Sequence, residues 1–254
     1  MLMTVILDFP AVVFATSFIV LCSSAYVGDF IRKRQLPMGD RDRGDLAVVQ
    51  GAAVTLLSLL IGFSFSMAIS RYEQRKSFEE AEANAIGTEY VRADLLPAAD
   101  GTKLRELLTR YLDQRILFYT TNDKQDLERA NTDTAQLQNE LWSNVQVCAR
   151  SQPSALTALA VSGMNDVLNS QGYTQAAWWN RIPAEAWVLL EVIAIGCNLL
   201  IGYGTHRTSM LFIVLPLAVS VSYFLIADID SPRGGVIRVQ PENLLSLARA
   251  LRTK

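Results

Sequence analysis

Histidine, cysteine, glycine and proline are all scarce in this chain of 254 residues, and each scarcity excludes a class of protein. A single histidine, His206, leaves no basis for histidine-rich metal sites or for most histidine-based catalysis. The three cysteines, Cys22, Cys148 and Cys197, are scattered, which argues against a disulfide framework or a zinc site. Glycine (14 residues) and proline (8 residues) are too few for a fibrous or low-complexity chain.

Charge and catalytic motifs are equally limited. Only 19% of the residues are charged and the net charge is −2, so no broad basic surface is available to bind nucleic acid. The sequence also lacks the zinc-protease, serine-hydrolase, P-loop, paired-cysteine and dinucleotide-binding motifs. We therefore expect a protein that is not an enzyme and that has no cofactor.

Long apolar runs dominate the sequence, since 50% of its residues are hydrophobic. Residues 9–28, 46–70 and 208–227 carry no charged side chain, and residues 186–205 carry one, Glu191. A bilayer core is about 30 Å thick, so a helix needs about 20 apolar residues to cross it. Because lipid offers no hydrogen-bond partner to the backbone, each run is predicted to be a transmembrane helix.

The order of these runs predicts an all-α protein, with a four-helix transmembrane bundle and a helical soluble insert between the second and third helices. Helix-forming residues continue past the second run, so we expect a single helix from about residue 46 to about residue 95. The predicted parts are a first transmembrane pair in residues 1–70 (helices 9–28 and 46–70), an insert at 71–182, a second transmembrane hairpin at 183–228 (helices 184–204 and 208–228), and a tail at 229–254 with a short helix.

The insert shows helical periodicity. One apolar stripe recurs at steps of three and four residues, as expected for one face of a helix: Leu104, Leu107, Leu108, Tyr111, Leu112, Arg115 and Ile116. Breaks are predicted at Pro97, at residues 121–123 and at residues 151–154, where turn-forming residues gather.

Two neighbouring rows run along the second transmembrane helix. Thr55, Leu59, Phe63 and Met67 are four residues apart and form a mainly apolar row, which could line a narrow passage that gates by dewetting. The adjacent row of small residues, Ser58, Gly62 and Ser66, could let helices approach closely. Spacing alone leaves another interpretation open, in which both rows pack inside the four-helix bundle.

The segment that carries these rows resembles the second membrane helix of bestrophins, through the Gly62-Phe63 pair, the small residues that follow, and Arg71-Tyr72. The whole chain resembles the bacterial bestrophin-like family of four-span membrane proteins, at residues 82–88, 92–97, 181–183 and 228–230. The resemblance implies a pentameric ion channel with Phe63 at a narrow apolar neck and Leu59 one turn earlier. It also implies that the insert and both termini are cytoplasmic.

Three further residues are candidates for chemistry. Bestrophins bind calcium through clustered acidic residues after the last span, and Asp228 and Asp230 are what this chain has there. Because calcium takes six to eight oxygen ligands, we expect these two to be a polar end to the helix and predict no metal site. Glu191, the intramembrane charge, could contact an ion or a proton, or could pair with another polar residue.

These observations leave three function classes. The first is a homo-oligomeric ion channel in the cell membrane whose pore is lined by the second transmembrane helix, with the lipid bilayer, copies of itself and inorganic ions as partners. The second is a membrane-anchored interaction or sensing module with no conducting pore. The third is a transporter or intramembrane enzyme that uses Glu191. Basic residues near the span ends favour an external insert, against the resemblance.

Overall fold

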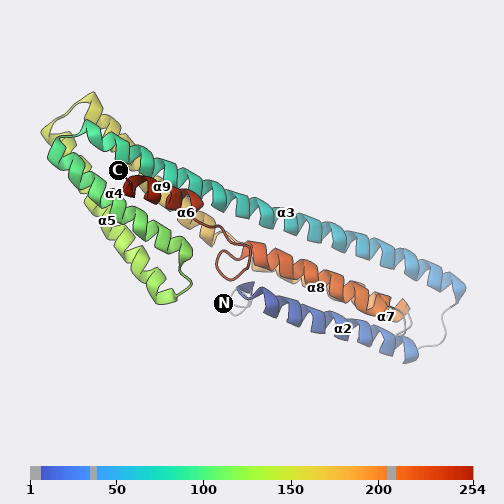
Figure 1. Ribbon diagram of the computed structural model, residues 1–254. Coiled ribbons are helices and arrows are strands. Elements are labelled where there is room, and N and C mark those ends of the chain that lie inside the picture. The colour runs from blue at the N-terminus through green and yellow to red at the C-terminus, as the bar shows by residue number, and fades with distance from the viewer. Residues whose placement is uncertain (1–6, 35–38, 205–209, 254) are drawn as a thin grey trace. The chain divides into compact units, whose positions relative to one another are not determined.

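Every regular element in the described part of the chain is helical, which confirms the predicted all-α class. The computed structural model describes residues 7–34, 39–204 and 210–253, so His206 lies outside the described residues. The helices, shown in Figure 1, are α2 (Pro10–Arg34), α3 (Asp40–Arg92), the short 3₁₀ helix η1 (Ala93–Leu95), α4 (Ala98–Thr120), α5 (Lys124–Ser151), α6 (Ala155–Trp179), α7 (Ala184–Gly204), α8 (Leu211–Asp230) and α9 (Glu242–Arg252).

Within the described residues, four helical stretches are long and apolar enough to cross a membrane, as the sequence predicts. They are α2, the helix that contains α3, the stretch that contains α6 and α7, and α8. The helix predicted from about residue 46 to about residue 95 is a single α-helix from Asp40 to Arg92, and η1 completes it. It ends there because Pro97 cannot continue a helix.

The chain divides into two compact units. The first, called the apolar unit here, combines residues 1–72 with residues 181–238 and so holds α2, the first part of α3, α7 and α8. The second, the polar unit, combines residues 73–180 with residues 239–254. The tail predicted as a separate part at 229–254 is thus shared between the two units, and its helix α9 packs with the polar unit.

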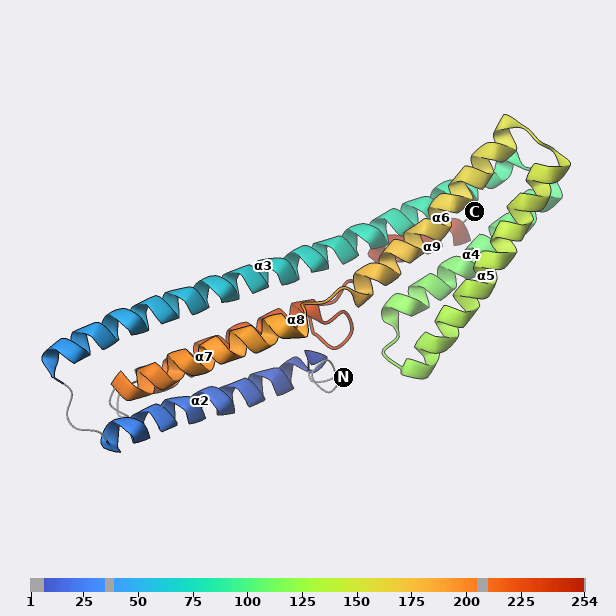
Figure 2. The ribbon, with the colours of Figure 1, turned by 180° about the vertical axis from the view of Figure 1, so that it is seen from behind.

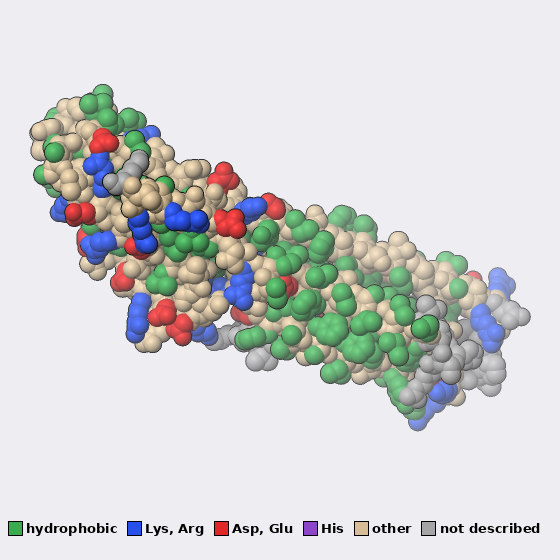
Figure 3. Space-filling view, viewed as in Figure 1, with side chains coloured by type: hydrophobic (Ala, Val, Ile, Leu, Met, Phe, Trp, Pro, Cys, Tyr) green, Lys and Arg blue, Asp and Glu red, His purple; other side chains and the backbone are tan. Residues whose placement is uncertain are grey.

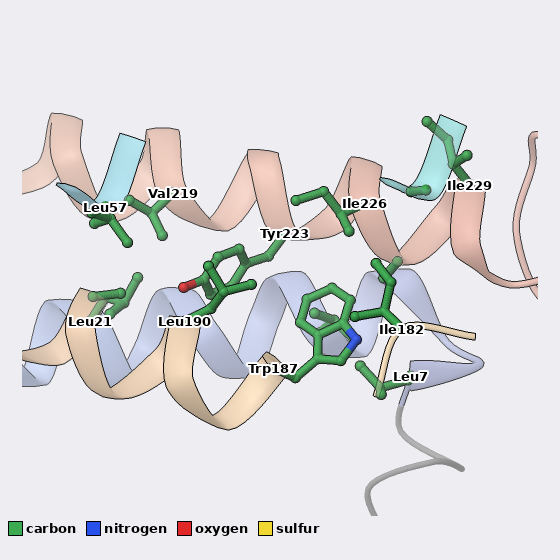
Figure 4. Close-up of a cluster of buried hydrophobic side chains, with 14 of the residues drawn as sticks. Leu7, Leu21, Leu57, Ile182, Trp187, Leu190, Val219, Tyr223, Ile226 and Ile229 are labelled. Atoms are coloured by element: carbon green, nitrogen blue, oxygen red, sulfur yellow. The ribbon is translucent and has the colours of Figure 1, made fainter. Parts of the chain in front are cut away.

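The apolar unit is built around side chains that α2, α7 and α8 bury against one another. Figure 4 shows this cluster, in which Trp187 of α7 and Tyr223 of α8 meet edge to face with ring centroids 5.9 Å apart. The outer surface that α2 and α8 present in Figure 3 is mostly hydrophobic as well. A unit that is apolar both inside and outside is what a bilayer requires.

Glycine brings α2 and α7 into backbone contact. A side chain at Gly28 would collide with the carbonyl of Leu199, and one at Gly202 would collide with the carbonyl of Ala25. The hydroxyl of Ser24 on α2 also donates a hydrogen bond of 2.7 Å to the carbonyl of Ile195 on α7. Between helices in lipid, such close approach and interhelical hydrogen bonding replace the hydrophobic effect as the source of affinity.

In the polar unit, α4 and α5 form an antiparallel hairpin (Figure 2). The hairpin turns at the predicted break, where the Asp123 carboxylate accepts hydrogen bonds from the backbone amides of Gln125 (2.7 Å) and Asp126 (3.1 Å) and so caps α5. The predicted stripe on α4 is buried from Leu104 to Arg115. A second predicted break precedes α6, which Ser154 caps together with Thr157.

A buried ion pair holds α3 and α4 together in the polar unit. Arg115, the charged member of the apolar stripe on α4, pairs with Glu82 of α3, and both side chains are 0% exposed. The same carboxylate accepts hydrogen bonds from Tyr119 (3.3 Å) and from Thr174 of α6 (3.1 Å). The Arg115 guanidinium lies 4.5 Å from the Phe118 ring centroid, a cation–π contact. One carboxylate thus links three helices.

Substituting one partner of this pair should cost more than substituting both. We expect Arg115→Met to lower the free energy of unfolding by about 3–5 kcal/mol, because Glu82 would be left as an unpaired buried charge. The double variant Glu82→Met with Arg115→Met should recover most of that loss. Thermal or denaturant unfolding of the detergent-solubilised protein measures both, and equal losses in the single and double variants would contradict the account.

Candidate functional site

The transmembrane part of α3 is attached to the rest of the apolar unit by one narrow stripe. Leu57, Ser64 and Ala68 are its buried residues. They follow steps of seven and four, which at 3.6 residues per turn places them on one line along the helix. Partly buried residues border this line on both sides: Ala53, Leu60, Ile61 and Tyr72. The remainder of the helix circumference is left uncovered by the chain itself.

Both rows identified in the sequence lie on the uncovered side of α3. Phe63 is 61% exposed and Leu59 is 53% exposed, and Thr55 and Met67 are exposed as well. The small-residue row, Ser58, Gly62 and Ser66, is also exposed. The interpretation in which both rows pack inside the bundle of one chain is therefore wrong. Their roles as pore-lining and helix-packing residues stay predictions.

The extent of this exposure sets α3 apart from its neighbours. In the most apolar 18-residue segment of α3, 6% is buried, whereas the buried share of the corresponding segment is 33% in α2 and 44% in α8. Two of the row hydroxyls are satisfied locally, since Thr55 donates to the carbonyl of Gly51 and Ser58 to that of Val54, each at 2.8 Å. These two hydroxyls can therefore face lipid, another helix or water without being left unpaired.

Asp228 closes the loop that follows α8. Its two carboxylate oxygens accept hydrogen bonds from the backbone amides of Val236 (2.7 Å) and Ile237 (2.9 Å). Gly235 fits against this turn because a side chain there would collide with the Asp228 carbonyl. Asp228 therefore fixes the path of the chain as it leaves the last transmembrane helix.

Asp230 lies at the centre of an arginine cluster in the apolar unit. Its carboxylate accepts hydrogen bonds of 3.2 Å from the backbone amide of Ile182, and it pairs with Arg181 (3.5 Å) and with Arg71 of α3 (3.7 Å). Arg181 also binds the carboxylate of Asp8 at 2.5 Å. The cluster therefore links α3, the segment before α7 and the end of α8.

Glu191 lies half-buried on α7, one turn after Trp187. It interacts electrostatically with the phenol of Tyr223 on α8, which belongs to the buried cluster of the apolar unit. The structure does not bring Glu191 together with the rows on α3, because those rows are exposed whereas the partner of Glu191 lies on α8.

These helices match a known family. A family model described as the bestrophin-like domain matches residues 14–244, which is most of the chain. The chain belongs to the bestrophin-like family. The resemblance predicted from Gly62-Phe63 and the later stretches is thereby confirmed.

Solved structures show the same fold for this bestrophin-like chain. Two crystal structures of variants of a bacterial bestrophin homolog from Klebsiella pneumoniae align with 94% of it. One has a TM-score of 0.64 at 12% identity over 97% of the homolog, and the other a TM-score of 0.68 at 11% identity over 96%. No curated protein matches the chain by sequence. At this identity the likeness concerns the fold alone.

The calcium site that the bestrophin resemblance implies does not fit these residues. Both oxygens of Asp228 accept backbone hydrogen bonds, and Asp230 is neutralised by Arg71 and Arg181. Among the described residues no group of three acidic, histidine or cysteine side chains could hold a metal ion. Calcium needs several free oxygen ligands, whereas arginine supplies the positive charge here. The resemblance to bestrophins alone makes the two aspartates weak metal candidates.

Sequence reasoning missed Arg71 and Arg181 as partners of Asp230, because residues this far apart in sequence carry no common period. It also missed that Glu82 is buried, although a signal was present. Arg115 lies within an apolar stripe, and a charged residue in such a stripe indicates a buried partner.

Glu89 is another buried carboxylate on α3, in the polar unit. It is fully buried against Gly163 of α6, where a side chain in place of glycine would collide with it. Neither of its oxygens has a hydrogen-bond partner, and Arg92 is 3.9 Å away. Burial raises the pKa of Glu89 from 4.5 to about 8, with Arg92 opposing the rise and Asp166 adding to it.

Calcium should leave the stability of the protein unchanged. We expect the same unfolding temperature in detergent with calcium or with the chelator EDTA, because the oxygens of Asp228 and Asp230 are already engaged. Differential scanning fluorimetry measures this. An upward shift with calcium that Asp228→Asn abolishes would contradict the assignment.

Glu89 should make the protein less stable as the pH rises. A carboxyl whose pKa is higher in the folded state than the unfolded value of 4.5 binds its proton more tightly when folded. Its contribution is complete below pH 4.5 and is lost as the pH rises toward about 8. We expect Glu89→Gln to flatten the pH dependence of the unfolding temperature over that interval, whereas the exposed control Glu80→Gln should preserve it.

Proposed function

We propose that the chain assembles with copies of itself into a ring whose axial passage is lined by α3, and that this passage conducts inorganic ions. The observation that carries the proposal is the uncovered side of α3, where both rows of the bestrophin-like segment are exposed. Family membership supports it, because the bestrophins that this family resembles are pentameric channels. The ring would be a homo-oligomer, a pentamer by that resemblance.

In this proposal the two rows of α3 have different roles. Phe63, with Leu59 one turn earlier, would form the apolar constriction, and Thr55 and Met67 would lie on either side of it. An apolar ring of this kind can lose the water inside it, and ions cannot cross the dry constriction. Ser58, Gly62 and Ser66, on the neighbouring row, would meet the α3 helix of the adjacent copy, since small side chains allow close approach.

The proposed orientation places the polar unit and both chain termini in the cytoplasm. The support is the resemblance to bestrophins, which outweighs the basic residues between the first two spans. A reporter fused at residue 120, the last residue of α4, tests the side directly. If a reporter at this position is active only on the external side of the membrane, the proposed orientation is reversed, but the proposed ring is not affected.

Phe63 is the residue on which the passage can be tested. We expect Phe63→Ala to raise ion flux into liposomes several-fold, because removing an apolar ring lowers the barrier to wetting. Phe65→Ala is the matched control, since Phe65 is a phenylalanine two residues away that points to a different side of the helix. We expect that variant to conduct like the unaltered protein.

Mass measurement in detergent decides the assembly before flux is measured. A ring of several copies with flux that responds to Phe63→Ala supports the proposal. Equal flux in the Phe63→Ala and unaltered proteins would show that Phe63 does not form the constriction. A monomer or dimer without flux would instead favour the membrane-anchored interaction module, with the polar unit as its binding part.

A further inference from the structure

Two carboxylates of α3, Glu82 and Glu89, lie in its contact with α6, and their surroundings differ. Both side chains are 0% exposed, and their spacing of seven residues places them on one line along the helix. Glu82 is bound by three donors, Arg115, Tyr119 and Thr174. The charge of Glu82 is therefore both paired and hydrogen-bonded.

Glu89 has no such support. Neither of its oxygens has a hydrogen-bond partner among the described residues, and the Nη1 atom of Arg92 is 3.9 Å from its Oε2 atom. The backbone of α6 lies directly against this carboxyl, because a side chain at Gly163 would collide with both Glu89 and Arg92. A buried charge without hydrogen bonds is costly, whereas a protonated carboxyl carries no charge to bury.

The charged side chains near Glu89 act in opposite directions. Arg92 of α3 favours the ionised form of the carboxyl, whereas Asp166 of α6 disfavours it, and burial is the largest influence against ionisation. On the neighbouring elements, Asp94 of η1 and Arg105 of α4 pair with each other. The packed arrangement of α3 and α6 therefore favours protonated Glu89.

We propose that Glu89 is a proton-controlled latch between α3 and the first half of α6, residues 155–166. While Glu89 holds its proton, Gly163 packs against it and this half of α6 stays on α3. When the proton is lost to water, this half separates from α3 and water hydrates the carboxylate. Its helix then opens, because a segment of this length with a glycine inside has little helical stability without packing.

The second half of α6, residues 167–179, has attachments to α3 of its own. Thr174 donates a hydrogen bond of 3.1 Å to Glu82, and Tyr173 stacks on Phe78 with ring centroids 5.9 Å apart. Neither contact involves Glu89, so ionisation of Glu89 leaves both in place. The latch therefore acts on one half of the helix, and it does not depend on ion conduction.

Amide hydrogen exchange of the full chain in detergent tests the latch, read by mass spectrometry and corrected for the intrinsic pH dependence of exchange. Opening lets Glu89 release one proton, so the protection of residues 155–166 should fall about tenfold per pH unit and level off near pH 8, where the packed carboxyl itself ionises. Residues 167–179 should lose much less. A constant first half, or an equal fall in both halves, overturns the proposal.

Variants assign the effect to Glu89. Glu89→Gln has a neutral side chain of the same shape, so its first half of α6 should stay equally protected across the range. Glu80→Gln removes an exposed carboxyl from the same helix and should behave like the unaltered protein. A fall that persists in Glu89→Gln overturns the latch. If Glu89→Gln fails to fold by circular dichroism, Asp166→Asn decides in its place, because losing this negative charge should make the fall level off at a lower pH. An unchanged profile in Asp166→Asn counts against the latch.

Discussion

In a bilayer, apolar side chains gain nothing by leaving lipid for protein, so helices associate only where backbones approach closely or polar groups pair. The contact between α2 and α7 has both features, in Gly28, Gly202 and the Ser24 hydrogen bond. The transmembrane part of α3 is attached by the stripe of Leu57, Ser64 and Ala68 and by a hydrogen bond from Gln50 to the carbonyl of Leu200 on α7, and the Arg71–Asp230 pair holds its end. The arrangement leaves most of α3 available to something other than its own chain, and the proposed function depends on that.

Arginine–carboxylate pairs hold the structure at the points where helices of different sequence regions meet. In the apolar unit, Asp230 links Arg71 and Arg181. In the polar unit, Glu82 links Arg115 to α6 through Thr174. Breaking one partner of such a pair leaves a charge in a low-dielectric environment, so each pair fixes one arrangement of its helices. Arg71 and Arg181 also neutralise Asp230, which lies where the bestrophin resemblance implied calcium.

The two proposals concern different units and different chemistry. The passage along α3 uses apolar and small side chains that the chain leaves exposed. The latch between α3 and α6 uses one buried carboxyl, Glu89, whose oxygens have no hydrogen-bond partner among the described residues.

The sequence by itself determined the helices, because their signals are local. Apolar runs of membrane length predicted the transmembrane helices, and the absence of proline before Pro97 predicted that α3 continues beyond the membrane. Helical period also placed Phe63 and Ser58 on adjacent rows. Only the tertiary structure decided which rows are covered, which arginine pairs with Asp230, and that Glu89 is buried against Gly163. Those facts depend on contacts between residues far apart in sequence, and periodicity along one helix does not specify its neighbour.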